Sequence, residues 1–300
     1  MRILIGVDGS AAAAVACEFV AERTWPMGTR VTLLGAAEPG VDWTGPAPPN
    51  DHGIQTETTA LEVLLENRAA QLRQRGLAVD THVEVGPAPE RLMSRAAATF
   101  VDLIVVGSRG LGPAASAVLG SVSAHLADHA PCPVLVVRSP SASRMLLATD
   151  GTRSSRNIPS LLAAWGNAFH GLPVEVVCIA PRAGFVTPWA AENEEGDAQV
   201  RLRADIADQV ADEMMELGWH AAAAVRSGDP SHEIVDAGVE WGADLIVTGS
   251  RGLGTLQRLV VGSVAHEVVL HARSSVLVVR GQVPATVSGL ATAVASLSAV

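Results

Sequence analysis

The stretch Val101-Asp-Leu-Ile-Val-Val-Gly-Ser-Arg-Gly-Leu-Gly112 decides the fold because it occurs twice. It returns 142 residues later as Ala243-Asp-Leu-Ile-Val-Thr-Gly-Ser-Arg-Gly-Leu-Gly254, with ten identical residues in twelve. The same offset aligns Val134-Leu-Val-Val-Arg138 with Val276-Leu-Val-Val-Arg280. Each copy is as long as a whole domain, whereas solenoid repeats span only about 20 to 50 residues. We therefore predict one fold present twice in tandem.

The repeat divides the chain into two domains and a tail. We expect the first domain at residues 1–140, the second at 141–281, and a mobile tail of small apolar residues at 282–300. With 48% hydrophobic and 17% charged residues, the chain can bury two substantial cores.

Short apolar runs alternate with helical patterns along each half. Strands without polar alternation are covered on both faces, and strand–helix alternation indicates a parallel, doubly wound α/β sheet. In the first half we expect strands at Arg2–Val7, Val31–Ala37, Val79–Val85, Leu103–Val106 and Val134–Val137, and helices at Ser10–Arg23, Thr58–Arg75, Pro89–Thr99 and Ser121–His129. Long loops, which are often functional, are expected at 39–50 and 181–196.

The composition excludes several kinds of chemistry. The chain has no Lys, so a Walker-type phosphate lysine, a Schiff base and a lysine general base are all excluded. The net charge of −10 and the absence of Tyr argue against a nucleic-acid partner. Three cysteines without CxxC spacing are typical of reduced packing residues, and no secretory signal is visible. We expect a cytoplasmic protein that does not engage a membrane.

A glycine-rich loop follows the fourth strand of each half. In the first half it reads Gly107-Ser-Arg-Gly110, then nine residues, then Gly120-Ser121 at the start of a helix. Glycines allow successive backbone N–H groups to face one anion, and a helix start adds donors with partial positive charge. Glycine turns and Ser N-caps also occur for structural reasons alone. Both halves have the loop with the same length and glycine spacing, and in each half an Asp, Asp8 or Asp150, ends the first strand. This combination of features favours a phosphate-bearing ligand.

This pattern resembles the ATP-binding motif of the universal stress protein family, and the resemblance covers residues 2–280. It implies a five-stranded parallel sheet of order 3-2-1-4-5 in each half, with ATP, accompanied by Mg²⁺, held by the loop after strand four. It also implies that the two halves pair through their last strands, and a homodimer is a further possibility. No metal-binding side chain and no catalytic residue are expected. The implied nucleotide contacts in the first half are Gly6, Asp8, Gly107, Ser108, Arg109, Gly110, Leu111, Gly112, Gly120, Ser121 and Val122, and in the second half Ala148, Asp150, Gly249, Ser250, Arg251, Gly252, Leu253, Gly254, Gly262, Ser263 and Val264.

The roles of these residues differ along the ligand. By the same resemblance, Asp8 and Asp150 contact the adenosine end, because a carboxylate beside a triphosphate would be repelled without a metal. The alternative for Asp8 is an N-cap of the first helix. The second phosphate loop carries an additional cation, Arg258, which would make the second site tighter and more sensitive to salt if its guanidinium faces the phosphates. The alternative is that Arg258 lies on a solvated helix face, where screening reduces its effect to a few tenths of a kcal/mol.

The resulting functional hypothesis is an ATP-binding stress-response regulator that acts through nucleotide-dependent conformation or partner binding. The alternatives are an interaction protein of the same fold that holds no nucleotide, a slow ATPase, and a protein that binds a cyclic adenine nucleotide. His129 and His271 recur at helix ends, where a cation complements the helix dipole, and this favours capping over catalysis. The acidic run 192–197 lacks ligand spacing and indicates a solvated loop.

Overall fold

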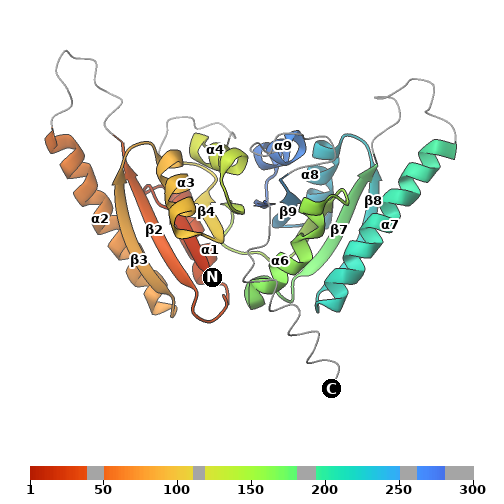
Figure 1. Ribbon diagram of the computed structural model, residues 1–300, viewed down its shortest axis with the longest axis horizontal. Coiled ribbons are helices and arrows are strands. Elements are labelled where there is room, and N and C mark those ends of the chain that lie inside the picture. The colour runs from red at the N-terminus through yellow and green to blue at the C-terminus, as the bar shows by residue number, and fades with distance from the viewer. Residues whose placement is uncertain (39–50, 111–118, 181–193, 251–261, 281–300) are drawn as a thin grey trace, which may run out of the picture. The chain divides into compact units, whose positions relative to one another are not determined.

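The computed structural model describes residues 1–38, 51–110, 119–180, 194–250 and 262–280 (Figure 1). Contacts within the chain divide it into two compact units, Met1–Pro140 and Ser141–Val300. Both units are α/β, as the sequence predicts, and each contains one parallel sheet with helices packed against it.

The first unit contains a five-stranded parallel sheet. β1 pairs with β2 on one side and with β4 on the other, β2 pairs with β3, and β4 pairs with β5. The spatial order is therefore β3-β2-β1-β4-β5. The strands are β1 (Arg2–Gly6), β2 (Arg30–Ala37), β3 (Ala78–Val85), β4 (Leu103–Gly107) and β5 (Val134–Val137).

Helices connect consecutive strands and cover both faces of this sheet. Right-handed crossovers place the helices of the outward run β1-β2-β3 on one face and those of the return run on the other. In agreement, α1 contacts α2 and α3 contacts α4. The helices are α1 (Ala11–Ala21), α2 (Asp51–Gln74), α3 (Ala88–Thr99) and α4 (Ser121–His129).

The apolar strand runs form the core. Ile3, Leu4 and Ile5 are at most 1% exposed, and all four residues of β5 are fully buried. Consecutive residues of a strand point to opposite faces, so burial of every residue requires packing on both faces. This packing explains why the strands read as unbroken apolar runs.

The second unit repeats the topology. Its strands pair in the order β8-β7-β6-β9-β10, all parallel. They are β6 (Met145–Thr149), β7 (Pro173–Ala180), β8 (His220–Ser227), β9 (Leu245–Gly249) and β10 (Ser275–Val279); the longer helices are α7 (Glu194–Glu216), α8 (Pro230–Trp241) and α9 (Ser263–His271).

The first helix of the second unit is interrupted. Where the first unit has the continuous α1, the second has a single turn, α5 (Arg153–Arg156), followed by α6 (Ile158–Ala164) and the 3₁₀ turn η1 (Gly166–Ala168). Pro159, in the first turn of α6, has no N–H and cannot continue a helix that begins at Arg153. The repeat alone predicts a continuous helix here, so this interruption differs from the expectation.

Two helix starts lie earlier than expected. α2 begins at Asp51 and not at Thr58, and α7 begins at Glu194, inside the segment expected to be a loop. Residues 51–57 contain a Gly and mostly polar residues, so apolar residues do not recur there at helical spacing. Once a helix is nucleated, each added residue gains one hydrogen bond and needs no apolar face of its own. Within the described ranges, no helix is long and apolar enough to span a membrane.

Candidate functional site

The expected site residues converge at the carboxyl ends of β1 and β4. These strands are neighbours, although β1 continues to β2 on its other side and β4 continues to β5. Strand order therefore reverses between them, and ligands of open α/β sheets bind at such a reversal. β6 and β9 form the equivalent pair in the second unit.

The loop after the fourth strand closes on itself in the same way in both units. In the first, the N–H of Gly120 donates to the carbonyl oxygen of Ser108 over 2.8 Å. In the second, Gly262 donates to Ser250 over 2.7 Å. The hydroxyl of Ser123 also donates to the Ser108 oxygen, over 3.2 Å. Each loop thus returns to the end of its own strand, where the next helix starts.

The helices that follow these loops begin with glycine. Gly120 is the N-cap of α4 and Gly262 is the N-cap of α9, and a glycine has no side chain that could accept from the first N–H groups. The next residues in each helix are the expected phosphate contacts, namely Ser121 with Val122 and Ser263 with Val264. Each helix start can therefore offer backbone N–H donors to an anion.

Asp8 and the glycine loop meet in the first unit. A Cβ placed on Gly110 would lie 2.7 Å from Asp8 Oδ2, so only glycine leaves room for this approach. The other carboxylate oxygen, Oδ1, accepts from the N–H of Ser10 over 3.0 Å. The Ser10 hydroxyl in turn donates to the carbonyl oxygen of Arg109 over 3.3 Å. These contacts join the residues that follow β1 to the residues that follow β4.

The N-cap alternative for Asp8 is wrong. Ser10 is the N-cap of α1, and its hydroxyl accepts from the N–H of Ala13 over 3.1 Å. Asp8 lies two residues earlier and is exposed. Its carboxylate therefore shapes the turn that leads into the helix, while Oδ2 faces the glycine loop.

Not every expected glycine faces this surface. A Cβ on Gly6 would lie 3.1 Å from both Leu92 and Val106, so its small size is explained by packing against α3 and β4. A Cβ on Gly107 would lie 2.5 Å from the backbone carbon of Ala12, so this glycine allows α1 to approach β4 closely. In the second unit Ala148 stands at the position of Gly6 and is buried.

The carboxylate of the second unit is held differently. Asp150 Oδ1 accepts from the N–H of Thr152 over 3.0 Å, from the Thr152 hydroxyl over 2.6 Å and from the Ser155 hydroxyl over 2.8 Å. The Thr149 hydroxyl donates to Ser155 over 3.1 Å. Ser155 is 1% exposed and Thr149 is 6% exposed, whereas Asp150 and Thr152 are half-buried, so the network extends from the core to the surface of the site.

Arg203 completes this end of the second site. It extends from α7, and its Nη1 donates to the carbonyl oxygen of Asp150 over 3.1 Å. The guanidinium also interacts with the thiol of Cys178, near the end of β7. Sequence reasoning missed Arg203, Thr149 and Ser155. The available signal was the repeat itself, which aligns these three with the apolar residues Leu61, Val7 and Ala13.

Positive charge gathers beside the first glycine loop. Gly107 pairs with Val137, so Arg109 and Arg138 follow the ends of neighbouring strands. The pKa of Arg138 is lowered to about 10, mainly by burial and secondly by the charge of Arg109. The two cations repel each other, and an anion bound near both would offset this repulsion.

Several expected contacts lie outside the described residues. They are Leu111, Gly112, Arg251, Gly252, Leu253 and Gly254, together with Arg258.

The histidines and cysteines have the roles that the sequence suggests. His129 and His271 lie in the last turns of α4 and α9, and each Nδ1 is about 3 Å from the carbonyl oxygen four residues earlier. All three cysteines are buried and none forms a disulfide, and burial raises the pKa of the Cys17 thiol to about 11. The Cys17 thiol is therefore protonated at neutral pH.

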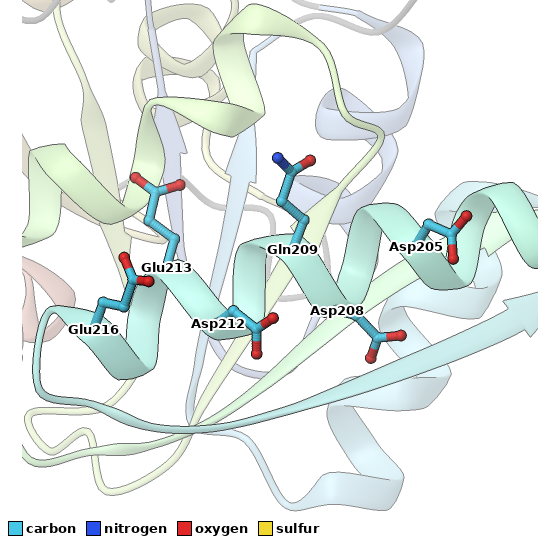
Figure 2. Close-up of a pocket in the computed structure, with 6 residues that line it drawn as sticks. All are labelled: Asp205, Asp208, Gln209, Asp212, Glu213 and Glu216. Carbon is cyan, nitrogen blue, oxygen red and sulfur yellow. The ribbon is translucent and has the colours of Figure 1, made fainter.

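A separate hollow of about 520 Å³ lies along α7, lined by Asp205, Asp208, Gln209, Asp212, Glu213 and Glu216 (Figure 2). Burial raises the pKa of Glu213, its hydrogen bond from Ser160 lowers that pKa, and the charge of Glu216 raises it again. In the described part of the chain, no three or more His, Cys, Asp or Glu side chains are placed so that they could hold a metal ion. All six side chains come from one helix, and we assign no site to this acidic face.

Comparison with protein families identifies the class of protein to which this geometry belongs. The model of the universal stress protein family matches residues 1–138 and again 142–280. The chain therefore belongs to the universal stress protein family, a stress-response family, and contains two of its domains in tandem.

Relatives with the same tandem arrangement occur in mycobacteria. Universal stress protein Rv2623 of Mycobacterium tuberculosis is 30% identical over 309 residues, which cover 93% of this chain and 96% of the relative. A universal stress protein of Mycolicibacterium smegmatis is 26% identical over 313 residues, with the same two coverages.

Solved structures support the fold. The crystal structure of a universal stress protein from Archaeoglobus fulgidus superposes with a TM-score of 0.65 at 18% identity, covering 93% of this chain and 98% of the other. A likeness at this identity supports the tandem α/β fold and carries no information about ligand.

Proposed function

We propose that this chain is an ATP-binding stress-response regulator whose two units each hold one nucleotide. The observation that carries the proposal is the duplicated loop, closed by Gly120 N–H on Ser108 in one unit and by Gly262 N–H on Ser250 in the other. Both loops end at a glycine-capped helix start beside the carboxyl end of the first strand. This is the arrangement that suits a phosphate chain attached to a nucleoside.

The ligand has one orientation that the charges favour. Its phosphates belong at the starts of α4 and α9, where backbone N–H groups and Arg109 are available. Its adenosine end belongs beside Asp8 or Asp150, because a carboxylate can accept from ribose hydroxyls but repels phosphate. Mg²⁺, in this proposal, is bound by phosphate oxygens and water and not by protein carboxylates.

The output we propose is a conformational or partner change in the cytoplasm that depends on bound nucleotide. The glycine loops and the turns after β1 and β6 are the segments that a nucleotide would contact in each unit. Buried, protonated thiols such as Cys17 suit a reducing compartment.

Calorimetric titration with Mg-ATP tests the proposal. We expect saturable binding with close to two nucleotides per chain. Native mass spectrometry of the purified protein should show the same stoichiometry, and cyclic AMP in place of ATP distinguishes the two adenine ligands. Absence of heat and of bound mass with both nucleotides would leave the interaction-protein alternative.

Variants of the loop glycines assign the binding to the loops. Gly110→Ala forces a Cβ to within 2.7 Å of Asp8 Oδ2 and should lower the affinity of the first unit by an order of magnitude or more. Gly252→Ala is its counterpart in the second unit. Gly28→Ala is the control for a glycine substitution remote from the site: no atom lies within 4 Å of a Cβ there, and although the φ of +78° makes the alanine locally strained, ATP affinity should be unchanged. Normal ATP binding by the folded double variant would refute the loop assignment.

A further inference from the structure

Arg203 lies at the end of the second site where the nucleoside would bind. Its Nη1 is fixed by the Asp150 carbonyl oxygen at 3.1 Å, and its guanidinium also contacts the Cys178 thiol. Its Nε is buried and, among the residues described, has no hydrogen-bond partner. A guanidinium carries five N–H donors, so these contacts leave donor capacity unused at this end of the site.

The equivalent position in the first unit shows that packing does not require an arginine. The repeat aligns Arg203 of α7 with Leu61 of α2. Leu61 is 9% exposed and covers Gly35, whose Cβ would lie 3.3 Å from the leucine methyl. A leucine therefore suffices to pack this helix on its sheet. Holding a guanidinium near strand ends, partly removed from water, is unfavourable unless it serves a further purpose.

We propose that Arg203 determines specificity in the second unit by donating hydrogen bonds to an acceptor on the nucleoside end of the bound nucleotide. The inference rests on the proposed ATP site and assigns to Arg203 the recognition of the nucleoside. The contact with the Asp150 carbonyl oxygen orients the planar fork, so little conformational freedom remains to be lost on binding. At the equivalent position the first unit has Leu61, whose side chain cannot donate a hydrogen bond.

The test compares affinities in a chain whose first site is disabled by Gly110→Ala. Arg203→Leu installs the residue of the first unit and should weaken Mg-ATP binding by about tenfold. Arg203→Lys retains the positive charge but lacks the planar guanidinium with its several N–H donors, and it should also weaken binding. Arg201→Leu, an exposed arginine on the same helix, is the matched control and should leave affinity unchanged. Amide hydrogen exchange of β6 and β7 checks that each variant is folded.

Inorganic triphosphate separates recognition of the nucleoside from general attraction of an anion. Its affinity should be the same in the unsubstituted background and in Arg203→Leu, because it has no nucleoside. An equal loss for triphosphate and ATP would overturn the inference, as would unchanged or tighter ATP binding by Arg203→Leu. Absence of ATP binding by the parent protein would instead refute the proposed function, and this inference with it.

Discussion

The two units share one topology but differ in the helix that follows the first strand. In the first unit, Ser10 caps a continuous helix whose first turn is made of alanines packed close to β4. In the second, hydroxyl residues occupy that turn and form a network with Asp150, and the helix ends at Arg156, before Pro159. The fold therefore accepts either apolar or hydroxyl residues in the first turn of the helix that follows the first strand. We expect the two sites to differ in stability and in ligand preference for this reason.

The largest expected difference concerns matched glycines. Gly107→Ala should destabilise the first unit by about 3 kcal/mol, because its Cβ would lie 2.5 Å from the Ala12 carbonyl carbon. Gly249→Ala should cost the second unit about 1 kcal/mol, because the nearest backbone atom, Ser155 N, is 3.2 Å away. Denaturant-dependent amide exchange, read separately for β4 and β9, measures both. Equal costs would mean that α5 approaches its sheet as closely as α1.

The buried hydroxyl network provides the second test. Ser155→Ala should cost about 1 to 2 kcal/mol, since it leaves the buried Thr149 hydroxyl and the Asp150 carboxylate without this partner. Thr149→Val should cost a similar amount. Both substitutions install the residues of the first unit.

The double variant Thr149→Val/Ser155→Ala should cost clearly less than the sum of the single variants, because removing both partners leaves fewer polar groups unsatisfied. Chemical denaturation of the four proteins gives the coupling energy. Strict additivity would show that the two hydroxyls do not act together.

The sequence predicts the fold well because its signals are local and repeated. The unbroken apolar strands and the glycine loop at Gly107 and Gly249 require only composition and spacing. Proximity of Asp8 to Gly110 also follows, since parallel strands end at one edge. The contact of Arg203 with Asp150 could not be predicted, because it depends on the rotation of α7 about its axis. The break at Pro159 has a local signal, because a proline inside a helical pattern ends or kinks the helix, but the repeat by itself predicts a continuous helix there.

A third prediction concerns the side-chain N-cap of α1, which has no counterpart at the start of α5. Ser10→Ala should destabilise that unit by about 1 kcal/mol, because the hydroxyl accepts from the N–H of Ala13. Ser10→Asn retains an acceptor without adding a charge to this buried position beside Asp8, and should remain within a few tenths of a kcal/mol of the parent. Thermal unfolding, with amide exchange of α1 as the local probe, distinguishes them. Equal destabilisation by both variants would assign the effect to the Ser10–Arg109 contact instead.

The smallest expected effect distinguishes the outer helices α2 and α7. Glu213 lies in the acidic hollow of α7, whereas the repeat places Gln71 at the same position of α2. Burial is the main reason that the pKa of Glu213 is raised. The native state therefore holds its proton to higher pH than the unfolded chain does, and stability contributed by the protonated form is lost as pH rises through the native pKa. Glu213→Gln removes this loss, so it should stabilise the second unit at neutral pH.

The gain from Glu213→Gln should be only a few tenths of a kcal/mol, because the side chain is partly exposed and solvent screens its neighbours. It should vanish below the ordinary pKa of a glutamate, where the parent is protonated in both states, and it should shrink in high salt. Gln71→Glu is the matched control. Its neighbours at the positions of Asp212 and Glu216 are Ala70 and Gln74, and Arg68 donates to the Gln71 side chain over 3.2 Å, so a glutamate there should show little or no penalty. Denaturant titrations of both variants at acid and neutral pH decide the matter, and a gain that persists at acid pH would assign the effect to packing and not to charge.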